Sequence, residues 1–102
     1  MSRELVVRPE AERDITDAAV WYERQSHGLG WDFTRVADAC LAEIVRNPSR
    51  FPEVRGRARR ALLRRFPFAV FFVVDDTSIR VIAVLHMRQN PERWQRRLRA
   101  DR

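Results

Sequence analysis

A chain of 102 residues, 45% hydrophobic and 33% charged, is long enough for one compact domain, which we predict to span residues 1–102. Its 3 glycines and 5 prolines exclude collagen-like and low-complexity chains, and the apolar residues spread along its length exclude a wholly disordered one. The formal net charge is +6 and all 20 basic residues are arginine, so lysine chemistry, such as a Schiff base or a P-loop lysine, is excluded.

The N-terminal segment predicts a short strand followed by a helix. Residues Arg3–Arg8 are rich in apolar and β-branched side chains, and Pro9 ends this strand while its fixed φ suits the first position of a helix. Acidic residues in the next turn complement the positive end of the helix dipole. We therefore predict a helix over Pro9–Gln25, whose apolar stripe is formed by Ala11, Ile15, Ala18 and Tyr22.

A second helix is predicted after a tight turn. The segment Ser26–Gly30 holds two of the 3 glycines and interrupts the helical periodicity. Helical spacing then resumes and continues until Asn47 and Pro48, with an apolar stripe formed by Phe33, Val36, Ala37, Cys40, Leu41 and Ile44. The two helices form an amphipathic hairpin whose stripes need a common surface to cover.

The rest of the chain predicts three strands and a short helix. Its expected strands are Ala61–Leu63, the nearly continuous apolar run Phe68–Val74, and Ile79–His86. Turn residues at 75–78 join the last two strands in a hairpin. Alternation in the last strand places Ile79, Val81, Ala83 and Leu85 on one face and Arg80, Ile82, Val84 and His86 on the other. Pro91–Arg99 predicts a short basic helix.

These elements predict a two-layer α+β fold in the order β-α-α-β-β-β, with a short C-terminal helix. Because a helical hairpin returns the chain to the end from which it left, the strand after it is expected to run opposite to the first. Tight connections then keep the sheet antiparallel. One face of the sheet would pack on the hairpin, and the other would be free to form an arginine-lined concavity.

The cysteine count and the hydropathy pattern bound the location of the protein. The single cysteine, Cys40, cannot form an internal disulfide or a cysteine-rich metal site, which fits a reducing cytoplasm. No apolar run reaches the roughly 18 residues that span a bilayer, and the first residues, MSRELVVRPE, lack the apolar stretch of a signal peptide. We expect a cytoplasmic protein with no membrane partner, no metal and no cofactor.

The positive charge is concentrated in the C-terminal half. Up to Val54 the chain has 7 arginines against 10 acidic residues, a balance of −3, and after it 13 arginines against 4, a balance of +9. Such a field favours polyanions or an acidic protein segment as partners, because a guanidinium presents paired donors to phosphate and carboxylate. A surface on which arginine replaces lysine for solubility is the alternative explanation.

The later half resembles the RelE/ParE superfamily of toxins from bacterial type II toxin–antitoxin modules. The resemblance lies in the segments NPSRFPEVRG, RRALLRRFPFAVFFVVDDTSIRVIAVLH and MRQNPERWQRR, in that order, and RPEAERDITDAAVWYE is similar to the first helix of these toxins. It implies a small toxin that a cognate antitoxin holds inactive by wrapping it. RelE-like members cleave mRNA in the ribosome and ParE-like members poison DNA gyrase, so the mechanism must be argued from the site.

A ribonuclease needs a base for the ribose hydroxyl and positive donors around the phosphate. RelE-like nucleases use lysines, arginines and a tyrosine or histidine near the C-terminus, whereas this chain has no lysine and no tyrosine after Tyr22. Under this hypothesis His86 is the base, and Arg65 and Arg88 stabilise the phosphate. The alternative for His86 is structural: a histidine at a strand end that hydrogen-bonds to the backbone or packs beside Trp94.

The missing nucleolytic side chains favour a ParE-like toxin that binds a target, DNA gyrase, instead of cutting RNA. Arginine and tryptophan are the residue types that anchor interfaces, because they combine a large buried area with polar tips. A toxin remnant that serves only as a co-repressor is a third hypothesis. The residues predicted to bind the target are Arg60, Arg64, Arg65, Arg80, Arg88, Arg93 and Trp94.

Other residues that suggest chemistry have simpler interpretations. His27 lies in the predicted turn and is expected in solvent, and the adjacent Asp75 and Asp76 are expected to form the hairpin turn. Cys40 lies on the apolar stripe of the second helix, which predicts an inert buried thiol. The aromatic residues of the hairpin are expected in the core, with an exposed partner surface as the alternative: Trp21, Tyr22 and Trp31.

Overall fold

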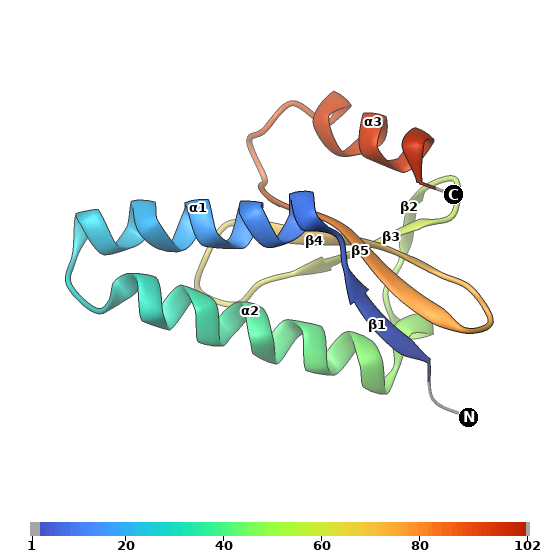
Figure 1. The fold of residues 1–102 in the computed structure, drawn as a ribbon, viewed down its shortest axis with the longest axis horizontal. Coiled ribbons are helices and arrows are strands. Elements are labelled where there is room, and N and C mark those ends of the chain that lie inside the picture. The colour runs from blue at the N-terminus through green and yellow to red at the C-terminus, as the bar shows by residue number, and fades with distance from the viewer. Residues whose placement is uncertain (1–2, 102) are drawn as a thin grey trace.

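The computed structural model describes residues 3–101, so Met1, Ser2 and Arg102 of the predicted domain lie outside the described residues. Its elements, in chain order (Figure 1), are β1 Glu4–Val7, α1 Pro9–Gln25, α2 Leu29–Arg46, the 3-10 helix η1 Pro48–Arg50, β2 Glu53–Arg55, β3 Ala58–Leu62, β4 Phe68–Val74, β5 Ser78–His86 and α3 Glu92–Ala100. The predicted α+β class and the order of its predicted elements are confirmed. None of the helices within residues 3–101 is long and apolar enough to cross a membrane.

The sheet is mixed, which corrects the predicted antiparallel arrangement. Its five strands lie in the order β1-β5-β4-β3-β2, and β1 pairs with β5 in parallel while the other neighbours are antiparallel. The prediction was wrong because it omitted β2, a three-residue strand that pairs with β3 across a turn at Gly56, where φ is 54°. Each hairpin reverses the chain, so one omitted strand inverts every later strand relative to β1.

A β-bulge in β5 changes which side chains face which layer. Val81 pairs with Phe72 and Ala83 pairs with Phe71, so Ile82 is an extra residue without its own partner on β4. The predicted alternation therefore holds up to Ile82 and is wrong for Ala83, Val84 and Leu85. Beyond the bulge, Val84 joins the cluster under the hairpin, whereas the opposite cluster receives Ile82, Ala83 and Leu85.

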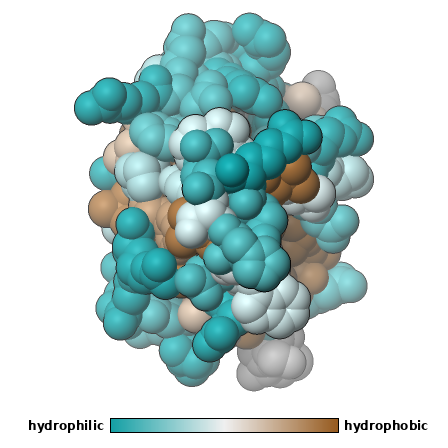
Figure 2. All heavy atoms as spheres, turned by 90° about the vertical axis from the view of Figure 1, so that its left-hand side faces the viewer, coloured by the Kyte–Doolittle hydropathy of each residue, from teal (hydrophilic) through white to brown (hydrophobic). Residues whose placement is uncertain are grey.

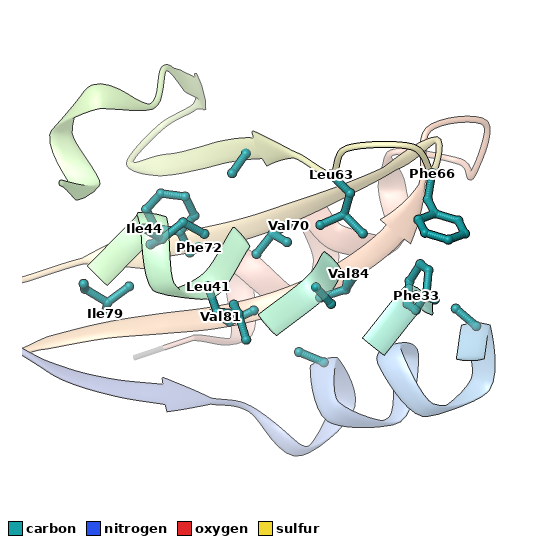
Figure 3. Close-up of a cluster of buried hydrophobic side chains, with 14 residues drawn as sticks. Phe33, Leu41, Ile44, Leu63, Phe66, Val70, Phe72, Ile79, Val81 and Val84 are labelled. Carbon is teal, nitrogen blue, oxygen red and sulfur yellow. The ribbon is translucent and has the colours of Figure 1, made fainter. Parts of the chain in front are cut away.

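The main core lies between the helical hairpin and the sheet (Figure 3). Phe33, Ile44 and Phe72 are among its largest fully buried side chains. Tyr22 closes the end of this core by packing against aromatic rings, with Phe33 at 5.4 Å and Phe66 at 4.8 Å between ring centroids. Aromatic rings bury large areas and prefer such offset and edge contacts, so this end of the core is well anchored.

The predicted core placement of the hairpin tryptophans is wrong. Trp21 is 56% exposed and Trp31 is 68% exposed, whereas Tyr22 is half-buried as expected. Helical spacing shows that residues share a face, but it does not show how wide the covered face is. Only Tyr22 of these three aromatic residues points into the core.

The turn between α1 and α2 is held by Glu23. Its carboxylate accepts the backbone N–H groups of Gly28 and Gly30 at 3.0 Å, where the positive end of the α2 dipole adds to the attraction. These two N–H groups lower the pKa of Glu23. Gly30 also lets the helices approach closely, because a Cβ there would lie 2.4 Å from the carbonyl oxygen of Ala19.

The second face of the sheet is covered, which corrects the prediction of a free arginine-lined concavity. A smaller apolar cluster fills it, and α3 lies over this cluster on the side of the sheet away from the hairpin (Figure 1). Trp94 stacks on Phe71 with ring centroids 4.4 Å apart and an interplanar angle of 11°. The strand residues of this cluster are Ala58, Ala69, Phe71, Val73, Ile82, Ala83 and Leu85.

Candidate target-binding site

Most of the predicted site residues meet at one end of the sheet. The loop between β3 and β4 and the loop between β5 and α3 are joined by a backbone hydrogen bond from Met87 to Pro67, 2.8 Å long. His86 is the register partner of Phe68, the first residue of β4. The two loops therefore bring together, from distant parts of the chain, Arg64, Arg65, His86 and Arg88.

The arginines of the first loop are exposed and only loosely paired. Arg65 has a left-handed backbone (φ 68°), and its guanidinium lies 5.2 Å from the centre of the Phe66 ring and 3.5 Å from Asp32. Arg64 lies 3.6 Å from Glu43, with 86% of its side chain exposed. Exposed ion pairs of this length contribute little to stability, so both guanidinium groups are available to a partner.

His86 is held by its backbone neighbour. Its Nδ1 accepts the backbone N–H of Arg88 at 3.0 Å, and its ring meets the edge of Phe68 at 5.3 Å between centroids. An Nδ1 that accepts a hydrogen bond carries no proton, so the proton of the neutral ring is assigned to Nε2. The other ring nitrogen is therefore a donor. The structural interpretation of His86 is confirmed for its backbone hydrogen bond, and the ring packs on Phe68 instead of Trp94.

Two hollows lie on either side of His86. One, of about 260 Å³, has an apolar floor that includes Phe71 and Trp94 and is also lined by Arg60. The other, of about 210 Å³, lies beside α1 and is lined by Asp17, Gln89 and Arg93 among others. Arg60, Trp94 and Arg93 thus border the same end of the sheet, but not in one shared pocket. Figure 2 shows this end of the molecule, where the surface is mainly hydrophilic with smaller hydrophobic areas between.

Arg80 lies apart from the other predicted site residues. Its side chain is 12% exposed and binds Asp75, at the hairpin turn, and Asp101, at 2.9 Å. The Asp101 side chain is 1% exposed. Hydrogen bonds from the Thr77 backbone and from Arg80 lower the pKa of Asp75, and both carboxylates raise the pKa of Arg80. The guanidinium of Arg80 is therefore bound by carboxylates of the protein itself and is not available to a partner.

A buried ion pair that sequence reasoning missed fixes the position of α3. The guanidinium of Arg97 donates two hydrogen bonds to the Asp14 carboxylate, at 2.6 and 3.1 Å, and one to the carbonyl oxygen of Ile82 at 3.1 Å. Asp14 also accepts the backbone N–H of Val84 at 3.0 Å. These bonds satisfy the edge of β5 just beyond the end of β1. The sequence signal was an aspartate on the apolar stripe of α1, between Ala11 and Ala18.

A metal site would need several ligating side chains close together. Within residues 3–101, no group of three or more His, Cys, Asp or Glu side chains is placed to hold a metal ion. His27 has a fully exposed side chain, 3.1 Å from Glu23, as expected for a turn residue. Burial raises the pKa of the Cys40 thiol to about 11, which fits the predicted inert thiol.

Comparison with solved structures finds proteins of similar fold. A solved structure described as a chromosomal ParDE toxin–antitoxin system from P. aeruginosa aligns with a TM-score of 0.70 at 17% identity, covering 83% of this chain and 96% of that chain. A double arginine-to-alanine mutant of the E. coli toxin RelE in the free state aligns with a TM-score of 0.64 at 15% identity, covering 98% of both chains. These likenesses concern the fold.

The sequence comparisons are more specific. No curated protein matches the chain. The family model described as the ParE toxin of the type II toxin–antitoxin system, parDE, matches residues 5–91, which include both helices of the hairpin, β2 to β5 and all of β1 except Glu4. The predicted resemblance to the RelE/ParE superfamily is confirmed, and the chain belongs to the ParE toxin family of type II toxin–antitoxin systems.

Proposed function

We propose that this toxin acts in the cytoplasm by binding DNA gyrase, and that it does not cut RNA. The observation that carries the proposal is the hydrogen bond from the Arg88 N–H to Nδ1 of His86. A general base must offer a free lone pair to the proton it removes. With Nδ1 occupied, His86 offers a donor N–H instead, and the basic half of the chain has no other histidine, no lysine and no tyrosine.

The proposed gripping surface is the end of the sheet where the two loops meet. Arg64, Arg65 and Arg88 are exposed there, and the hollow beside Trp94 adds an apolar floor. Exposed guanidinium groups around an apolar hollow suit a protein interface, because arginine supplies both contact area and directional donors. Membership of the ParE family implies an antitoxin partner, and we propose that the antitoxin inactivates the toxin by covering this surface.

A supercoiling assay with purified gyrase tests the proposal. The double variant Arg65→Ala/Arg88→Ala is expected to lose inhibition at least tenfold, whereas His86→Ala should inhibit gyrase like the parent chain. Arg24→Ala, on the outer side of α1, is the matched exposed-arginine control. Equal inhibition by all variants would contradict the proposed surface, and no inhibition by the parent chain would contradict the proposed target.

A ribosome-dependent mRNA endonuclease is the second candidate. It is favoured by one observation, that Arg65, His86 and Arg88 lie at the same end of the sheet. Mapping of mRNA ends after induction in cells separates the two functions. Codon-phased cuts that disappear in the His86→Ala variant would establish the endonuclease and overturn the gyrase proposal.

A further inference from the structure

A second basic surface runs from Arg93, at the border of the proposed gripping surface, across the outer side of α3 to the adjoining β2–β3 hairpin. We define it as the α3 basic strip; it consists of the exposed arginines Arg55, Arg57, Arg93, Arg96 and Arg99. The hairpin and α3 are neighbours, because the Arg57 guanidinium donates to the carbonyl oxygen of Asp101 at 3.2 Å. Arg55, Arg96 and Arg99 all lie close enough to Glu92 to lower its pKa.

Helix geometry turns these side chains outward. Trp94 is buried and Leu98 is half-buried against the sheet, so the opposite side of α3 faces solvent. Arg93, Arg96 and Arg99 follow one another at intervals of three residues and so form a row on that side. Arg97, in contrast, points inward to Asp14. Glu92 is the acidic residue of the helix itself, and it pairs with Arg99.

The strip has the character of a nucleic-acid surface and lacks that of a protein interface. The large exposed hydrophobic residues of the described chain lie off α3 and off the turn that joins β2 to β3, Leu62 being the last residue of β3: Val20, Trp21, Trp31, Val45, Leu62 and Met87. Protein interfaces need an apolar centre, whereas interfaces with DNA are polar and strongly positive. Single-stranded nucleic acid is recognised by exposed aromatic rings, and the one aromatic ring of α3, Trp94, is buried.

We propose that the α3 basic strip binds the phosphate backbone of duplex B-form DNA without sequence preference. A helix of 9 residues is about 13 Å long, and a duplex has one negative charge per about 1.7 Å of its axis, so a length of duplex equal to the helix carries about eight charges, more than the arginines of the strip. A convex helix fits the wide major groove of B-form DNA and not the deep, narrow groove of A-form RNA. The inference goes beyond gyrase binding, because it requires no protein target.

Salt titration of binding to a fluorescein-labelled mixed-sequence 20-bp duplex, followed by anisotropy, tests this proposal with the full chain alone. Five phosphate contacts predict a slope of log K against log[NaCl] of about −4.5. The Arg96→Ala/Arg99→Ala variant should reduce the slope to about −2.7 and weaken binding about tenfold or more at 0.1 M NaCl. Lysine at both positions should restore most of the slope, because the contact is electrostatic.

The control is Arg24→Ala/Arg35→Ala, which removes the same charge from exposed positions on α1 and α2. Its slope should stay at the parent value. An equal loss in the control, or no binding by the parent chain at 50 mM NaCl, would overturn the proposal, and tighter binding of duplex RNA or single-stranded DNA would overturn the assignment to duplex DNA. Supercoiling assays on the same variants report gyrase inhibition separately, so failure of one proposal is distinguishable from failure of the other.

Discussion

The two faces of the sheet are covered in different ways. The hairpin face is covered by helices of 17 and 18 residues over a cluster of 14 buried apolar residues. The α3 face has a helix of 9 residues over a cluster of 8. A helix as short as α3 is only marginally stable by itself. Its position on the sheet therefore depends on hydrogen bonds and ion pairs more than the position of the long hairpin does.

Those contacts are two ion pairs at the edges of α3. Arg97 reaches Asp14 on α1, and Asp101 at the end of the helix reaches Arg80 on β5. Because buried charges must be paired with good geometry, these contacts specify where α3 lies more than they add net stability. The comparison indicates that apolar burial stabilises the fold from the hairpin side, whereas polar geometry positions the basic helix on the other side.

The largest expected loss of stability comes from a substitution in the core between the helical hairpin and the sheet. Phe33→Ala removes a fully buried ring that contacts three aromatic neighbours, and it should lower the free energy of unfolding by about 4 kcal/mol. Urea denaturation followed by circular dichroism measures the change. The exposed Trp31→Ala is the control and should stay within about 0.5 kcal/mol of the parent chain. A comparable loss in the control would contradict the assignment of the core.

A smaller effect is expected from the ion pair that holds α3. Asp14→Asn leaves the Arg97 guanidinium without its carboxylate, and we expect a loss of about 2 kcal/mol in the free energy of unfolding. Amide hydrogen exchange in α3 should rise more than exchange in α1. A double-mutant cycle with Arg97→Gln should give a coupling of about 1 kcal/mol or more. Strict additivity would show that the two side chains do not stabilise the helix jointly.

A weaker effect on the melting temperature is expected in acid, where the contact between Asp75 and Arg80 is lost. The pKa of Asp75 is lowered by hydrogen bonds from the Thr77 backbone, the Arg80 side chain and the Ser78 backbone. A lowered folded-state pKa contributes stability that is complete above the unfolded value, near pH 4, and is lost as the pH falls through the folded value. Melting temperatures from pH 7 to pH 2 should therefore fall less steeply below pH 4 in Asp75→Asn. A profile parallel to that of the parent chain would argue against this role.

The smallest expected effect concerns the reactivity of the Cys40 thiol on α2. With its pKa raised by burial from 9.0 to about 11, Cys40 should react with iodoacetamide at pH 8 about a hundredfold more slowly than a free thiol. The same protein unfolded in urea is the control and should react at the free-thiol rate. Rapid alkylation of the folded protein would show that the α2 side opens readily.

Much of the secondary structure was predictable because local signals agreed with tertiary packing. The helix Pro9–Gln25 and the strand Phe68–Val74 have the predicted bounds, since a proline start and an unbroken apolar run depend on nearby residues alone. The strand β2 was missed because three residues around Val54 show no periodicity of their own. The bulge at Ile82 was missed for a related reason: it exists only relative to the register of β4.

The sequence predicted which types of residue form the site better than it predicted how they are arranged. Arginines near the ends of β3 and β5 were expected to act together, and Arg65 and Arg88 do lie at one end of the sheet. Arg80, on the same strand as His86, lies at the other end and is bound to two carboxylates. Which guanidinium meets an internal acid depends on contacts such as that between Arg80 and Asp101, 21 residues apart.

The amino-acid order by itself determined the fold class, the hairpin, the central strand and the concentration of arginine in the later half, because propensity, periodicity and charge are carried by neighbouring residues. Only the tertiary structure decided the parallel pairing of β1 with β5, the cover that α3 places over the second face, and the ion pair between Arg97 and Asp14. Each of these depends on groups that the folded chain brings together from distant positions, and hydrogen bonds need both partners in place.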